Sequence, residues 1–146
     1  MTSAEFVISA VFPRDFPTDG RPEIALVGRS NVGKSSLINA LVRRVVARTS
    51  ASPGKTRQVN VYRMTPAGGS PFYLMDLPGY GHTSGGKQAQ REFGALTALY
   101  FGSRTSPGDT RNHSRSDFVS PLCAVVLAVD ARHPGLAGDV DDARTH

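Results

Sequence analysis

Short apolar runs along the chain have the length of β-strands and predict a largely buried sheet. The runs are 6–12, Glu23–Val27, Val59–Met64, Phe72–Met75 and Leu122–Val129. Where such a run is unbroken, it is typical of a strand with both faces covered. We expect this above all for Leu122–Val129, and we expect Cys123 within it to be a small buried core residue.

Two further segments have apolar residues at helical spacing. After Gly33 these residues are Leu37, Ile38, Leu41, Val42 and Val45, which would place one apolar stripe against the sheet. In Gln88–Phe101 the corresponding face is Phe93, Leu96, Leu99 and Tyr100. Strands that alternate with helices in this way predict an α/β sheet with helices on its faces.

The remaining segments are polar or rich in glycine and proline. Residues 1–22 contain Pro13, Pro17, Gly20 and Pro22, and we interpret them as an N-terminal arm before a single domain, 23–146. Residues 49–56 and 79–86 are predicted loops. The polar, aperiodic stretch Ser103–Ser120 is interpreted as an exposed insertion.

Composition narrows the class of protein. The chain has 146 residues, of which 39% are hydrophobic and 20% charged, and this is enough for one domain with a core. No apolar stretch approaches the ~18 residues of a membrane span. The first apolar run is too short and interrupted for a signal peptide, and the single cysteine, Cys123, excludes an internal disulfide. We expect a cytosolic protein without a membrane partner.

The net charge of +5 is unevenly distributed along the chain. No acidic residue occurs between Glu23 and Asp76, whereas eight lysines and arginines do. A strongly positive face favours a polyanionic partner such as RNA. A merely solvated basic face remains an equal alternative, because no RNA-binding motif with stacking aromatic residues is present.

The segment Gly28–Ser35 matches the P-loop pattern GxxxxGKS and lies between a predicted strand and a predicted helix. Its backbone N–H groups and the following helix dipole would hold phosphates, with Lys34 neutralising the outer phosphates and Ser35 ligating Mg²⁺. The residues expected to line this site are Gly28, Arg29, Ser30, Asn31, Val32, Gly33, Lys34, Ser35 and Ser36.

A second phosphate motif, Asp76-Leu77-Pro78-Gly79, follows the strand Phe72–Met75. A carboxylate there can orient Mg²⁺ through a water, and the N–H of Gly79 can reach the γ-phosphate. Between the two motifs, Gly54-Lys55-Thr56 forms part of a predicted switch loop in which the Thr56 hydroxyl would reach the metal. Thr49 is a competing candidate for this role.

Together these residues resemble the EngB-type (YihA/YsxC) ribosome-biogenesis GTPases. The resemblance rests on Glu23–Leu41, Ala47–Ser50, Pro53–Thr56, Asp76–Gly81 and Val129–His133. It implies a P-loop NTPase fold of the Ras-like GTPase type, with three layers and a mostly parallel sheet. It also implies binding and hydrolysis of GTP, assembly of the large ribosomal subunit with pre-ribosomal RNA as partner, and Mg²⁺ bound by Ser35 and Thr56.

Three features depart from this family. The guanine-recognition motif Asn/Thr-Lys-x-Asp has no counterpart, 103–120 resembles an insertion, and Val140–His146 lacks an apolar helix face. We therefore expect the front part of such a protein, with a fold incomplete at its C-terminus and little discrimination between GTP and ATP. In such a fragment Leu122–Val129, a central strand in the family, would become an exposed edge.

The mechanism of hydrolysis is also open at this point. Tyr80 occupies the position where many P-loop GTPases carry a glutamine that orients water, so another group would have to act. Candidate catalytic residues are Lys34, Thr56 and Asn31. In related GTPases an asparagine at the P-loop position of Asn31 can ligate K⁺, although Asn31 could simply stabilise the loop. Rival interpretations are an inactive phosphate-binding remnant with a basic RNA-binding surface and, less compatible with the two switch motifs, a P-loop kinase or ATPase.

Overall fold

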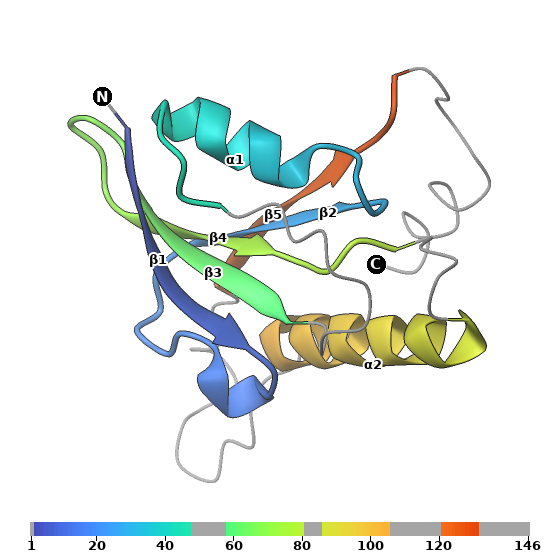
Figure 1. Cartoon of the computed structure of the whole chain (residues 1–146). Coiled ribbons are helices and arrows are strands. Elements are labelled where there is room, and N and C mark those ends of the chain that lie inside the picture. Colours follow the sequence, from blue (N-terminus) through green and yellow to red (C-terminus); the bar gives the residue numbers. More distant parts are fainter. Residues whose placement is uncertain (1, 48–57, 81–85, 106–120, 132–146) are drawn as a thin grey trace, which may run out of the picture.

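A computed structural model describes residues 2–47, 58–80, 86–105 and 121–131 (Figure 1). In chain order the elements are β1 (Ser3–Ala10), the 3₁₀ turn η1 (Pro13–Asp15), β2 (Glu23–Gly28), α1 (Lys34–Val42), β3 (Val59–Thr65), β4 (Phe72–Asp76), α2 (Gly86–Thr105) and β5 (Leu122–Ala128). Strands and helices thus fall where the hydrophobic pattern predicts them. The predicted loop at 49–56 and most of the predicted insertion lie outside the described residues, but Ser103–Thr105 belong to α2.

The five described strands form one sheet in the order β1-β3-β4-β2-β5. β2 is parallel to both β4 and β5, whereas β3 is antiparallel to both β1 and β4. Of the five strands described, four therefore point the same way and β3 is reversed. Within residues 1–22, β1 is an integral edge strand of this sheet.

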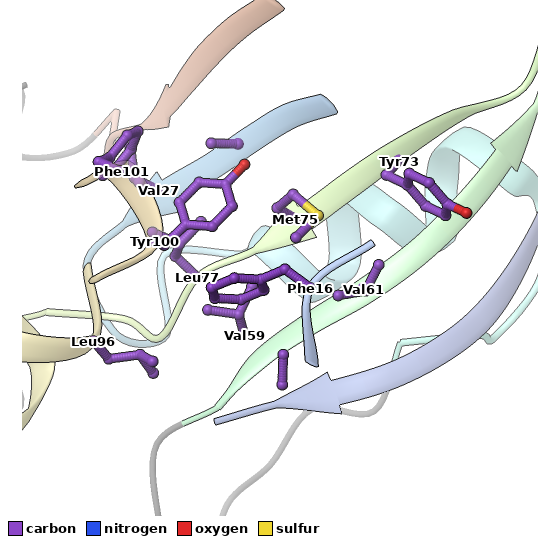
Figure 2. Close-up of a cluster of buried hydrophobic side chains, with 12 residues drawn as sticks. Phe16, Val27, Val59, Val61, Tyr73, Met75, Leu77, Leu96, Tyr100 and Phe101 are labelled. Atoms are coloured by element: carbon purple, nitrogen blue, oxygen red, sulfur yellow. The ribbon is translucent and has the colours of Figure 1, made fainter. Parts of the chain in front are cut away.

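The helices cover opposite faces of the sheet, which gives the three layers predicted for a P-loop NTPase (Figure 1). One core lies between the sheet and α2, where Tyr100, Phe101 and Leu96 pack on Val27, Met75 and Leu77 (Figure 2). The other lies on the α1 side and includes Leu26, Ile38, Val42, Ala47, Tyr62, Met64 and Leu74. Alternate residues of β2 enter opposite cores, as the strand period of two requires.

A buried ion pair joins β2, α2 and the segment after η1. Glu23 Oε2 accepts hydrogen bonds from Tyr100 OH (2.9 Å) and Arg104 Nε (3.0 Å), and its Oε1 lies 3.0 Å from Arg104 Nη2. Arg104 Nη2 also donates to the carbonyl oxygen of Pro17. Because Glu23 is 1% and Arg104 9% exposed, water screens this pair little.

The apolar face predicted for α1 is too wide. Ile38 and Val42 are buried, but Leu37 and Leu41 are 42% and 54% exposed. The helix also ends at Val42, before Val45, because Arg43 adopts the left-handed conformation (φ 52°) and its N–H returns to Ala40. In α2, Leu99 is likewise exposed, while Thr97 and Arg104 are buried beside Leu96 and Tyr100.

The prediction of full burial for Leu122–Val129 is wrong for the described part of the chain, and so is that for Cys123. Cys123 is exposed, and Val125 and Val126 are 44% and 42% exposed. The cause is topological: among the described strands β5 pairs only with β2 and lies at an edge of the sheet, which agrees with the expectation of an exposed edge. No helix among the described residues is long and apolar enough to cross a membrane.

Candidate phosphate-binding site

The P-loop connects the carboxyl end of β2 directly to the amino end of α1. Its turn uses left-handed backbone at Asn31 (φ 62°) and Gly33 (φ 105°). A side chain at Gly28 would place its Cβ 2.7 Å from the carbonyl oxygen of Ala128, so only glycine allows β5 to approach this closely. Gly33 provides no side chain to cap α1. The first N–H groups of the helix are therefore available to an anion.

Lys34 folds back over this loop. Only 8% of the residue is exposed, and its Nζ donates to the carbonyl oxygens of Gly28 (3.2 Å) and Arg29 (3.4 Å). Burial lowers the pKa of the amine, and the negative charge of Asp76 opposes that shift. A buried ammonium group thus lies within the turn that would receive phosphates.

Asp76 brings a buried carboxylate to the same end of the sheet. It is 7% exposed, and burial raises its pKa to about 6, against the opposing effects of the Lys34 charge and a hydrogen bond from the Asn60 side chain. Among the described residues, its Oδ1 has no hydrogen-bond partner. Such an orphaned buried oxygen is rare in native proteins and suits a cation or a water bound to one.

The chemistry of these donors fits Mg²⁺ rather than a metal held by protein alone. The described residues contain no group of three or more His, Cys, Asp or Glu side chains that could hold a metal ion. Mg²⁺ in nucleotide sites uses one or two protein oxygens together with phosphates and waters. The Asp76 carboxylate and the half-buried Ser35 in the first turn of α1 match that pattern.

The DLPG segment is joined to the P-loop by its backbone. Leu77 N–H donates to Leu26, Tyr80 N–H to Gly28, and Ser30 N–H to Tyr80 (2.8 Å), so the parallel pairing of β2 and β4 continues past the strand ends. A Cβ on Gly79 would lie 2.6 Å from Ser30 Cα. Tyr80, in the position of the usual glutamine, is buried.

Gly79→Ala is expected to separate the two phosphate motifs, because the P-loop backbone cannot yield to the new methyl group. We expect nucleotide affinity to fall at least about tenfold and the chain to be destabilised by about 1–3 kcal/mol. Gly94→Ala is the matched control, since nothing lies within 4 Å of its Cβ position in α2. The stability of the Gly94→Ala control should rise by up to about 1 kcal/mol, because alanine has a higher helix propensity than glycine. Thermal melts and nucleotide titrations measure both; equal affinities in the two variants would contradict this contact.

Most of the site residues predicted from the sequence are brought together. Gly28–Ser36 and Asp76–Gly79 converge at one end of the sheet, whereas Thr49, Gly54, Lys55 and Thr56 lie outside the described residues. Asn60, which lies opposite Asp76 on β3, was not among the predicted site residues. The one available signal was an amide side chain within the otherwise apolar start of a strand.

Residues 23–119 match the family of proteins described as 50S ribosome-binding GTPases. The chain is also similar to "Probable GTP-binding protein EngB" of Geobacillus thermodenitrificans (strain NG80-2), with 43% identity over 141 residues that cover 96% of this chain and 63% of the relative. The protein of the same name from Clostridium perfringens (strain 13 / Type A) is 45% identical over 139 residues, 94% of this chain and 61% of the relative. The protein of the same name from Alkaliphilus oremlandii (strain OhILAs) is 44% identical over 138 residues, which cover 94% of this chain and 57% of the relative. The chain thus spans 57–63% of the length of these relatives.

Proposed function

The chain belongs to the EngB proteins of the 50S ribosome-binding GTPase family, and we propose that it binds GDP and GTP with Mg²⁺ and hydrolyses GTP. The observation that carries this proposal is the pair of buried opposite charges beside an uncapped helix start. Lys34 and Asp76 are 8% and 7% exposed, and Asp76 Oδ1 has no protein partner among the described residues. A site of this kind is completed by a ligand that carries both negative charge and a cation.

Each part of the proposed site has a defined task. The N–H groups of the P-loop and of the first turn of α1 would hold the phosphate oxygens, with Lys34 neutralising their charge. Ser35 and Asp76 would hold Mg²⁺, directly or through water, together with Thr56 from the predicted switch loop. The metal would supply charge neutralisation across the β- and γ-phosphates. Gly79 N–H would sense the γ-phosphate.

Hydrolysis needs a group other than a glutamine after the DxxG motif. Tyr80 is buried, whereas Asn31 is exposed on the P-loop. We propose that Asn31 holds K⁺ near the phosphates, where a cation would act as an arginine finger does. GTP turnover measured in potassium and in sodium chloride, with the wild type and Asn31→Ala, tests this role; equal rates in both salts would contradict it.

The partner we propose is RNA of the large ribosomal subunit, in its assembly in the cytosol. Support comes from the description of the family and from the run of eight basic and no acidic residues between Glu23 and Asp76. Discrimination of guanine from adenine is a separate property, because the 146 residues contain no Asn/Thr-Lys-x-Asp motif. Titrating the chain with ADP and with GDP and comparing the two affinities measures this discrimination.

Lys34→Ala and Ser35→Ala test the proposed nucleotide site. We expect Lys34→Ala to weaken GDP binding by about tenfold or more, because the phosphates lose a buried countercharge. Ser35→Ala should weaken binding only when Mg²⁺ is present. Arg44→Ala also removes one positive charge, but from an exposed residue beyond the other end of α1, and should bind as the wild type does. Titration with a fluorescent GDP analogue measures all four chains, and equal affinities would refute the site.

A further inference from the structure

We propose that Asn60 is a positioning residue for the metal site: held by Ser9, it fixes the Asp76 carboxyl group so that Oδ1 is left for Mg²⁺. The inference rests on the proposed function, because it concerns how the same site is prepared for its metal. Asn60 and Ser9 belong to neither of the two phosphate motifs.

Ser9, Asn60 and Asp76 form a row across three neighbouring strands. Ser9 of β1 is the direct partner of Asn60 of β3, and Asn60 is the direct partner of Asp76 of β4. Val59 and Val61, on either side of Asn60, enter the core beneath α2. By strand alternation Asn60 therefore faces the opposite, α1 side of the sheet, which is the side of the P-loop helix.

The hydrogen bonds in this row have a fixed direction. Ser9 Oγ donates to Oδ1, the amide oxygen of Asn60, at 2.7 Å. The amide nitrogen of Asn60 then remains as the donor toward Asp76, whose carboxyl group accepts a hydrogen bond from the Asn60 side chain. Oδ1 of the same carboxyl group has no such partner among the described residues. The carboxyl group therefore has a donor on the neighbouring strand β3, and its Oδ1 is left for a ligand.

Other groups around the carboxylate do not replace this contact. Lys34 acts on Asp76 through charge, and the charge of Asp76 in turn raises the pKa of Tyr62. The acceptors of Lys34 Nζ, however, are the carbonyl oxygens of Gly28 and Arg29. The Asn60 side chain is therefore the neighbour that fixes the carboxylate orientation. Outer partners that orient metal ligands typically change metal affinity by about 10- to 100-fold when they are removed.

The test measures how GDP affinity depends on Mg²⁺ in four variants of the whole chain. Asn60→Leu keeps the branched shape of the side chain but removes both hydrogen bonds. Ser9→Ala removes only the anchor of Asn60, whereas Ser9→Thr retains the hydroxyl group. Thr65→Ala changes an exposed residue at the far end of β3 and serves as the control. Fluorescent GDP is titrated in EDTA and over a series of Mg²⁺ concentrations, and a thermal melt accompanies each variant.

We expect Asn60→Leu to require about 10- to 100-fold more Mg²⁺ for half of its maximal effect on GDP affinity, with affinity in EDTA unchanged. Ser9→Ala should raise the Mg²⁺ concentration for the half-maximal effect by a smaller factor. Ser9→Thr should leave this concentration at the wild-type value. A Mg²⁺ dependence that stays constant while only the melting temperature falls would show a purely structural role and overturn the inference. Should Asn60→Leu not fold, the Ser9→Ala and Ser9→Thr pair decides by the same criterion. If the wild type itself shows no Mg²⁺ effect, the proposed function fails instead.

Discussion

Asp76→Asn is expected to stabilise the chain without ligands at neutral pH and, at the same time, to remove the effect of Mg²⁺ on nucleotide affinity. Burial raises the pKa of Asp76 to about 6 from an ordinary value near 3.8. The ionised carboxylate is therefore less favourable in the folded than in the unfolded chain. A shift of about two units corresponds to roughly 2–3 kcal/mol, which asparagine should recover because it resembles the protonated acid.

The dependence of stability on pH has a definite sign. The folded chain binds the Asp76 proton more tightly than the unfolded chain does, so the favourable contribution is complete below about pH 4. It is lost as the pH rises from about 4 to 6, and it is absent above that range. Asp76→Asn should lack this loss between pH 4 and pH 6, and its advantage over the wild type should be greatest at pH 7 and above.

Denaturant unfolding at pH 4, 5, 6 and 7 measures this difference directly. Adding GDP and Mg²⁺ should reverse the order of stabilities, because only the wild-type carboxylate can complete the metal site. Asp19→Asn is a suitable control, since this exposed carboxylate has a lowered pKa and its replacement should not stabilise the chain. A less stable Asp76→Asn chain at pH 7 would contradict the conclusion that burial makes the ionised Asp76 carboxylate destabilising.

Arg104→Ala should have the largest effect on stability, a loss of about 3–5 kcal/mol. The substitution leaves the Glu23 carboxylate buried without its countercharge, and it removes the hydrogen bond to Pro17 that ties α2 to the segment after η1. Tyr100 would remain as a neutral donor to Glu23. The free energy of unfolding of a typical domain is about 5–15 kcal/mol, so this loss would be a large fraction of it.

A double substitution distinguishes the uncompensated charge from lost packing. Glu23→Gln together with Arg104→Met removes both charges and retains the apolar stem, so it should be less damaging than Arg104→Ala alone. Arg63→Ala breaks the exposed ion pair with Glu5 and should change stability by less than about 1 kcal/mol. Urea unfolding monitored by circular dichroism measures all three; similar losses for Arg63→Ala and Arg104→Ala would contradict the role of burial.

The row that holds Asp76 and the buried pair at Glu23 lie at opposite ends of the parallel strands. Asp76 is the last residue of β4, beside the P-loop, whereas Glu23 begins β2. Ligand sites in open α/β sheets lie at the carboxyl ends of the strands. One end of the sheet therefore carries unsatisfied charge for a ligand, while the other end satisfies its buried charges within the protein and stabilises the fold.

The sequence by itself determined the phosphate motifs and the strands and helices, because each depends on contiguous residues. The spacing of Gly28, Gly33 and Lys34 defines a turn that few other local structures use, and the apolar runs define strands of matching length. The resemblance to the EngB family then led to the three-layer P-loop fold, and the family match confirms it.

Only the tertiary structure decided which residues act together across the sheet. Asn60 meets Asp76 because β3 pairs with β4 in one register, and Glu23 meets Arg104 across 81 positions of sequence. For Leu122–Val129 the sequence left two expectations, full burial and an exposed edge, and the order of the described strands decides for the edge, where Cys123 is exposed. Strand order arises from the packing of the whole chain, so the apolar pattern of one strand does not say which strands become its neighbours.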